Sequence, residues 1–242
     1  MSVFAALVRR ELGVYFVSPM AYVILTVLLV FSGFVFVSEM GRFAAHRLPV
    51  DTAATLSVTC WVVILMSALV TMRLLAEEKA RGTLEIMLTA PVTEVQFVLA
   101  KFLAALILLV YLLLPTLGYV LIASMYGQVD WGAVACGYLG ILLVGAAVYS
   151  IGIFVSALSS SQVTAGIVTL VVALLLLILT IAGLALDEKS PWRRVIETVD
   201  LTANFMDFLR GVVDTSRLTY LLSVPVFFLF LTSRAVQSRR WR

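Results

Sequence analysis

Long apolar runs alternate with short polar stretches along most of the chain. A bilayer core about 30 Å thick is crossed by roughly 20 helical residues, and six runs reach or approach that length. We place them at residues 19–37, 55–75, 97–125, 132–158, 163–186 and 218–233. Within each run the apolar residues are continuous rather than alternating, which argues against a transmembrane β-barrel. The pattern therefore predicts an all-α membrane protein with six transmembrane helices.

The composition agrees with this prediction. Of 242 residues, 62% are hydrophobic and 13% are charged, and the mean hydropathy is +1.11. A soluble domain has about 45–50% apolar and about 25% charged residues, so the excess apolar surface requires lipid. We expect one transmembrane domain over residues 1–242. Cys60 and Cys136 lie within apolar runs, which favours packing over a disulfide. No cleavable signal pattern precedes the first run.

The distribution of basic residues predicts the orientation. An even number of spans puts both termini on one side, and ten of the 17 Lys and Arg residues fall on that side. Because basic residues are enriched in cytoplasmic loops, we expect both termini in the cytoplasm of a bacterial cell and the protein in its cytoplasmic (inner) membrane. The formal net charge of +3 requires no nucleic acid as a partner.

The segment at residues 2–16 has apolar residues at helical spacing and charges on other faces. This pattern predicts an interfacial amphipathic helix, although a frayed, positively charged anchor is an alternative. Ser18 and Pro19 suit the N-cap and first position of the following membrane helix. The residues assigned to this elbow helix and its junction are Arg9, Arg10, Glu11, Tyr15, Ser18 and Pro19.

Two further amphipathic segments precede the last span, at residues 187–216. Apolar and charged residues again separate by helical spacing, with a break near Leu201 and Thr202. We expect a short extracytoplasmic helical hairpin that lies on the outer leaflet or dips into it. The other outside segment, residues 38–54, is predicted to be a short polar loop. It holds His46, and one histidine with two dispersed cysteines does not suggest a metal or haem site.

Two spans have unusual residues. Pro115 predicts a kink in the third span, where polar neighbours allow either a pathway lining or simple helix packing. The fourth span contains repeated glycines, including Gly137 and Gly140. Small residues let membrane helices approach closely, so we interpret these glycines as a packing face.

The polar island at residues 77–96 lies between the second and third spans. Apolar residues from Ala80 to Leu88 fall on one helical stripe, which predicts a cytoplasmic amphipathic helix over residues 77–90. Gly82 suggests a kink because glycine disfavours helix by roughly 1 kcal/mol relative to alanine. Pro91 ends the helix, and the sequence from Thr93 to Gln96 predicts a capping box. An ordinary polar loop is the alternative interpretation.

Two motifs carry a resemblance to a known family. The island resembles the first cytoplasmic loop of ABC-2 type transporter permeases, in the positions Glu78, Gly82, Thr83, Glu85, Pro91 and Lys101. The opening segment resembles the elbow helix and first span of the gliding-motility-type and copper-processing-type branches, in the positions Arg10, Glu11, Tyr15, Ser18, Pro19 and Tyr22. The span pattern fits the family over nearly the whole chain.

The resemblance implies a permease subunit of an exporter, with ATP hydrolysis in a separate ATP-binding subunit that holds ATP and Mg²⁺. The chain itself has no G-x-x-x-x-G-K-[ST] phosphate loop and is expected to hold no cofactor. By analogy, the island is the coupling helix, and a second permease subunit, identical or paralogous, completes the membrane part. The predicted contacts with the ATP-binding subunit are Glu77, Glu78, Arg81, Gly82, Thr83, Leu84, Glu85, Met87, Leu88, Pro91, Ser160 and Ser161.

Three alternatives remain at this stage. A membrane enzyme would need a base near a serine such as Ser156, and the spans offer no clear one. An ion-driven secondary transporter would need charges at mid-membrane, where the predicted spans have essentially none. A mechanotransmission subunit that moves no cargo is also compatible with the sequence. Nothing in the sequence identifies a cargo.

Overall fold

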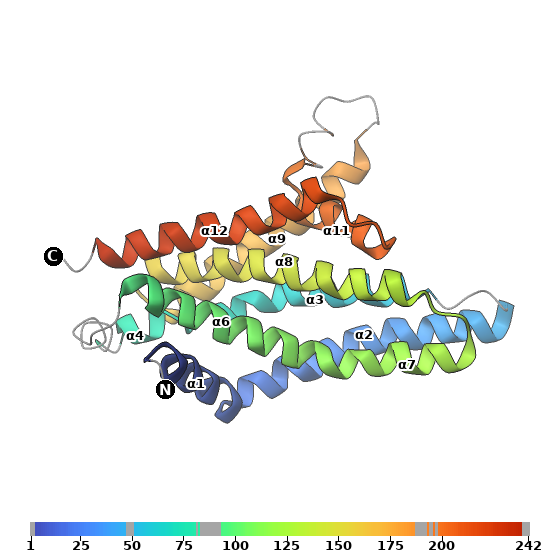
Figure 1. Ribbon diagram of the computed structural model, residues 1–242, viewed down its shortest axis with the longest axis horizontal. Helices are drawn as coiled ribbons and strands as arrows, with labels where there is room; N and C mark the ends of the chain where they lie inside the picture. The colour runs from blue at the N-terminus through green and yellow to red at the C-terminus, as the bar shows by residue number, and fades with distance from the viewer. Residues whose placement is uncertain are drawn as a thin grey trace.

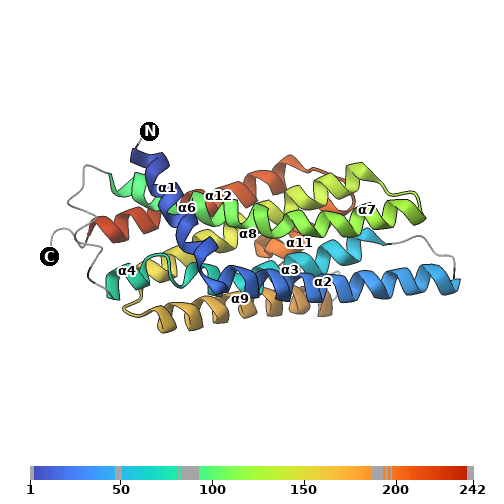
Figure 2. The ribbon, with the colours of Figure 1, turned by 90° about the horizontal axis from the view of Figure 1, so that it is seen from below.

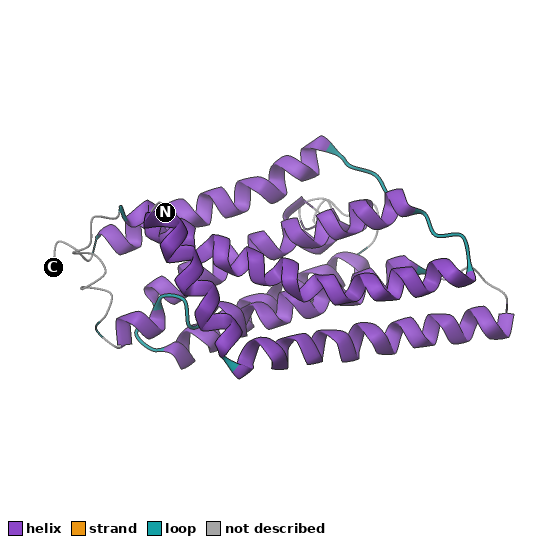
Figure 3. Ribbon diagram, turned by 60° about the horizontal axis from the view of Figure 1, so that its bottom comes forward, coloured by secondary structure: helices purple, strands orange, loops and turns teal. Residues whose placement is uncertain are grey.

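The computed structural model describes residues 3–46, 51–80, 82, 93–186, 193, 196 and 198–238. Throughout that part of the chain the regular structure is helical, without strands (Figure 3). The elements are α1 (Val3–Val17), α2 (Pro19–His46), α3 (Thr52–Thr71), α4 (Ala76–Ala80), α6 (Glu94–Leu113), η1 (Leu114–Thr116), α7 (Leu117–Tyr126), α8 (Trp131–Leu158), α9 (Gln162–Ala185), α11 (Leu201–Leu209) and α12 (Thr215–Gln237).

Six helical segments are long and apolar enough to cross a membrane, which confirms the predicted all-α membrane protein. They are Pro19–Ala45, Thr52–Ala80, Glu94–Tyr126, Trp131–Leu158, Gln162–Gly183 and Thr215–Gln237. These segments run along the long axis of the molecule, and both termini lie at the same end as α4 (Figure 1). Helix α1 does not follow this axis but crosses the bundle near that end (Figure 2).

Helices α3, α6 and α8 form the centre of the bundle. In their most apolar windows 56–61% of the residues are buried, against 22–28% in α2, α9 and α12. The outer helices therefore expose long rows of apolar side chains, as a lipid-facing or subunit-facing surface does. The predicted kink is present in the third span, where Pro115 lies in the 3₁₀ turn η1 between α6 and α7.

The glycines of α8 permit the close packing of the centre. A Cβ atom at Gly137 would lie 2.8 Å from Leu56 Cδ1 of α3, and one at Gly140 would lie 2.8 Å from Phe205 Cδ2 of α11. Gly145 and Gly152 meet α6 and α3 in the same way. The interpretation of this span as a packing face is therefore confirmed.

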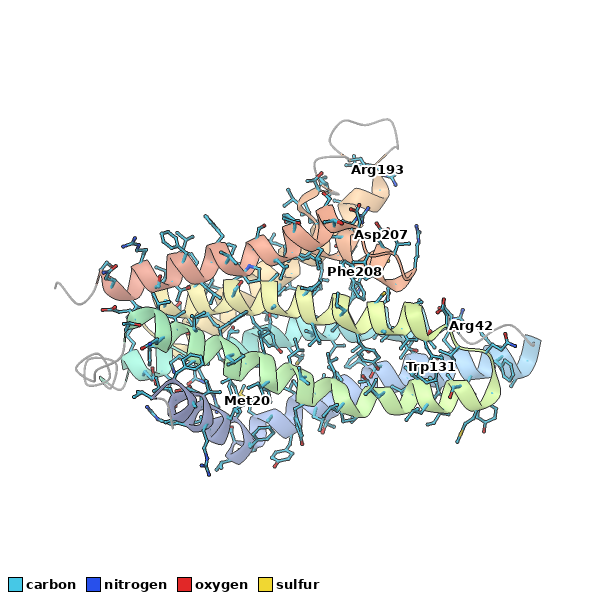
Figure 4. All side chains as sticks on the ribbon, viewed as in Figure 1. Met20, Arg42, Trp131, Arg193, Asp207 and Phe208 are labelled. Carbon is cyan, nitrogen blue, oxygen red and sulfur yellow. The ribbon has the colours of Figure 1, made fainter. Side chains whose placement is uncertain are left out.

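Helix α11 packs into the bundle against α8. Asp200 caps its first turn by accepting a hydrogen bond from the Thr202 backbone, in agreement with the break predicted near this point. Phe205 and Phe208 are buried, and Phe208 lies where α11 meets α8 (Figure 4). Of the preceding predicted helix, residues 187–192, 194, 195 and 197 lie outside the described residues, and those described are helical.

One predicted loop is wrong in part. Residues 38–46, assigned to a polar loop, continue helix α2 as far as His46. The extra turns are supported by an ion pair between Glu39 and Arg42, one turn apart, in which Glu39 is buried. The apolar run thus ends at residue 37, but the helix continues through the polar residues that follow it.

The glycines of α8 that contact α3, α6 and α11, which we call the glycine face, allow a direct test of the central packing. We expect Gly140→Ala to destabilise the protein by about 1–3 kcal/mol because its methyl group overlaps Phe205 and Phe208. The measurement is thermal unfolding of the purified permease in detergent. Gly118→Ala on α7 is the matched control, since no atom lies within 4 Å of its Cβ position. Equal melting temperatures for the two variants would contradict this packing.

Candidate functional site

The most unusual group at the end that carries the termini is a buried lysine. Lys101 lies two turns into α6 and is 2% exposed. Its Nζ is 3.0 Å from Glu11 Oε2 of α1 and 3.0 Å from Glu78 Oε1 of α4. The ammonium group also lies 5.1 Å from the centre of the Phe97 ring. One side chain therefore joins three separate elements.

Arg10 completes this group, which we call the Lys101 cluster: Arg10, Glu11, Glu78 and Lys101. The Arg10 guanidinium lies 3.8 Å from Glu78 Oε1 and is about half exposed. The two acids and two bases balance in formal charge. Removing an ion from water costs several kcal/mol, which only well-placed partners offset. Each buried member of the cluster therefore depends on the others.

Local sequence places each member of the cluster. On α1, Val8 and Glu11 are the buried positions, one turn apart, so Glu11 lies on the inner face. Helix α6 begins with the predicted capping box, in which the Thr93 and Gln96 side chains each accept a bond from the other's backbone at 3.3 Å. The capping box fixes the start of α6, and Lys101 follows on its buried face.

Two further contacts hold α1 to the end of α3. The Tyr15 hydroxyl donates a hydrogen bond of 3.0 Å to the Val70 carbonyl. Burial, with smaller effects from Tyr149 and Glu11, raises the pKa of Tyr15 well above its ordinary value, so it remains a donor at neutral pH. Ser18 Oγ accepts bonds from Met20 N at 3.3 Å and from Arg73 Nη1 at 3.2 Å.

The beginning of α4 is bound to the end of α8. Ser156 Oγ accepts hydrogen bonds from the backbone of Leu75 at 3.1 Å and of Ala76 at 3.0 Å. In return, Lys79 Nζ donates to the Ser159 carbonyl at 2.7 Å. These contacts satisfy helix-terminal groups of both elements, and a cation suits the C-terminal end of α8. Ser156 is fully buried. Its hydroxyl therefore has a structural role in joining α4 to α8, and it is not an accessible nucleophile.

The two motifs that carried the family resemblance meet in this region. The structure brings Glu11, Tyr15 and Ser18 of the first motif together with Glu78 and Lys101 of the second. Sequence reasoning missed the links from Lys79 and Ser156. Lys79 is 80 residues from its acceptor at Ser159, and Ser156 is 80 residues from its donor at Ala76. Contacts over such a sequence separation leave no periodic pattern, and they form only in the tertiary fold.

The predicted coupling helix is interrupted. Helix α4 ends at Ala80, and Gly82 has a φ of 68° in a turn whose N–H donates to the Lys79 carbonyl at 3.2 Å. A left-handed residue of this kind ends an α-helix, which agrees with the kink predicted at Gly82. The rest of the predicted helix over residues 77–90 lies outside the described residues and stays a prediction. Seven predicted partner contacts lie outside the described residues: Arg81, Thr83, Leu84, Glu85, Met87, Leu88 and Pro91.

The remaining predicted partner contacts have different surroundings. Glu78 is a member of the Lys101 cluster, and Glu77 lines a cavity together with the cluster residues. Ser160 is exposed in the turn between α8 and α9. Ser161 caps α9 by accepting a bond from Thr164 N at 3.2 Å. Their contact with an ATP-binding subunit stays a prediction.

Comparison with known proteins gives one family. The family model described as "ABC-2 family transporter protein" matches residues 5–236, which include α1, the Lys101 cluster and all six candidate spans almost entirely. No curated protein matches the chain.

We expect the members of the Lys101 cluster to depend strongly on one another in their contribution to the free energy of unfolding. We expect Lys101→Met to lower the free energy of unfolding by about 3–5 kcal/mol because it leaves two carboxylates without their cation. The charge-balanced double variant Lys101→Met, Glu11→Gln leaves Arg10 beside Glu78 as a neutral pair and should regain most of that loss. Denaturant unfolding of the purified protein measures both. If Lys101→Met were as stable as the unmodified chain, the cluster would contribute nothing to the free energy of unfolding.

The link between α4 and α8 gives a second prediction. Ser156→Ala removes the acceptor of two buried N–H groups, so we expect a loss of about 1–3 kcal/mol. Ser150→Ala on the same helix is the control, because the Ser150 hydroxyl only bonds the Ala147 carbonyl one turn away. Thermal unfolding separates the two variants. If the isolated chain had a hydrolytic activity that Ser156→Ala abolished without loss of stability, an enzymatic role would replace the structural one.

Proposed function

The chain belongs to the ABC-2 family of transporter proteins, and from this premise we propose that it exports a cargo using ATP hydrolysed by a separate subunit. Family membership makes it a transmembrane permease subunit of an ABC transporter, a type of chain that is normally non-catalytic. Such permeases usually work with an ATP-binding subunit. The export direction, the coupling and the cytoplasmic location of the termini belong to the proposal.

The observation that carries the proposal is the double attachment of α4. On one side, Glu78 connects α4 through Lys101 to α6 and α1. On the other, Lys79 and Ser156 connect it to the end of α8. Helix α4 also follows α3 directly after a short turn. A displacement of α4 therefore acts on the ends of three central spans at once.

The proposed mechanism uses this attachment. In our proposal, residues 77–90 and the turn at residues 159–162 contact the ATP-binding subunit from the cytoplasm. ATP-driven closure of two such subunits moves α4, and the Lys101 cluster passes the movement to α1 and α6. A second permease subunit, identical or paralogous, forms the other half of the pathway in a bacterial inner membrane.

The charge distribution supports ATP over an ion gradient as the energy source. Ion-coupled transporters usually hold their coupling ion with charged or strongly polar groups within the membrane. The described residues of α3, α8 and α9 contain no charged side chain. The buried charges Glu39 of α2 and Lys101 of α6 lie towards the ends of their spans and are ion-paired within the chain. A largely apolar interior of this kind suits an apolar or amphipathic cargo.

The coupling proposal is tested by reversing charges in the island. With Arg81→Glu and Glu85→Lys together, we expect the affinity for the ATP-binding subunit to fall by at least about tenfold, since mismatched charges at an interface cost several kcal/mol. Co-purification and ATP hydrolysis by the reconstituted complex are the measurements. Arg9→Glu, an exposed change on α1, is the control.

Two outcomes would overturn parts of the proposal. Unchanged complex formation and ATP hydrolysis in the double variant would remove the island from the interface. Normal coupling without movement of any cargo across sealed vesicles would favour a mechanotransmission role instead of export.

A further inference from the structure

A cavity of about 160 Å³ lies beside the Lys101 cluster, between α1, the start of α2 and the end of α3. One buried water needs only about 10–15 Å³ by this kind of measure, so the cavity has room for a group of several heavy atoms. Its lining has two parts. The polar part has charges of both signs, and the apolar part includes Met20, Ala21 and Ile24 of α2. The charged residues of the polar part are Arg10, Glu11, Arg73, Glu77, Glu78 and Lys101. Met20 lies at the junction of α1 and α2 (Figure 4).

Arg73 is a charged group of this lining that has no acid paired with it among the described residues. Its Nη1 donates to Ser18 Oγ at 3.2 Å, while its Nε is buried without a hydrogen-bond partner. Three acids line the cavity: Glu11 and Glu78 are bound by Lys101, and Glu77 is the third. Because the Arg73 guanidinium lines the cavity without a paired acid, the cavity favours a ligand that brings anionic oxygens to that guanidinium.

The polar and apolar residues of the lining are arranged in the same order as the headgroup and acyl chains of a membrane lipid. The arginines lie where α1 crosses the end of the bundle, and the apolar residues belong to the first turns of α2, which enters the membrane. Val14 and Val17 of α1 are exposed apolar residues, as expected of a helix at the interface. A guanidinium binds phosphate oxygens in a two-pronged geometry.

We propose that this cavity binds the phosphodiester headgroup of an anionic phospholipid, with the first acyl carbons against Met20, Ala21 and Ile24. The lipid contacts α1, α2 and α3 beside the Lys101 cluster, so its presence stabilises the position of α1. An anionic headgroup is preferred because a zwitterionic one brings its own cation towards Arg10 and Arg73. The inference holds whether or not the chain couples to an ATP-binding subunit.

The experiment measures phosphatidylglycerol binding to the intact permease in detergent by native mass spectrometry, over a range of lipid concentrations. Arg73→Gln should weaken the tightest-bound phosphatidylglycerol by about tenfold, as expected for one charge-assisted contact. Ala21→Leu should also weaken it, because it narrows the apolar part without changing any charge. Arg9→Gln is the matched control: Arg9 is exposed on α1 and does not line the cavity. Thermal unfolding checks that each variant is folded.

Each result decides the matter. Selective loss in Arg73→Gln and Ala21→Leu, with Arg9→Gln within about twofold of the unmodified chain, supports the site. Equal loss in Arg9→Gln and Arg73→Gln would show ordinary surface attraction and overturn it. Displacement of the lipid by millimolar inorganic phosphate would identify a site for free anions, and equal binding of phosphatidylcholine would remove the preference for anionic lipid.

Discussion

The end of this permease that carries both termini depends on the ion pairs of the buried Lys101 ammonium group. This ammonium group is shielded from water and is held by one carboxylate from α1 and one from α4. Because a buried charge is tolerated only with its partners in place, the position of α6 fixes the positions of both other elements. Three pieces of chain that are distant in sequence thus become one unit.

This unit explains why the small helices are where they are. Helix α4 has five residues, too few to be stable alone in water, and its place is set by contacts with Lys101, Ser156 and the end of α8. Helix α1 likewise rests on Glu11 and Tyr15. The close central packing, made possible by the glycines of α8, supplies the rigid support against which these polar contacts are aligned. Stability and proposed transmission therefore rest on the same contacts.

Much of this arrangement could be predicted from the sequence. The six spans, the capping box at Thr93, the kink at Pro115 and the glycine face all depend on local patterns, and the structure has them. The continuation of α2 beyond residue 37 was missed because a polar segment was equated with a loop, although Glu39 and Arg42 can pair along a helix. The kink expected at Gly82 agrees with its left-handed φ of 68°, while most of the predicted helix over residues 77–90 lies outside the described residues and stays a prediction. The site itself was only half predicted: its residues were named in two motifs, but their convergence on Lys101 depends on tertiary packing.

The central claim is that α1 and α4 move as one body because Lys101 joins them. The most direct measurement is the distance between spin labels at positions 9 and 80, both exposed, in a background with Cys60 and Cys136 replaced by alanine. The permease is assembled with its ATP-binding subunit, with and without nucleotide. We predict one narrow distance distribution that nucleotide does not shift, and a broadened one in Lys101→Met. A nucleotide-dependent change in the α1–α4 distance in the chain that retains Lys101 would contradict the account.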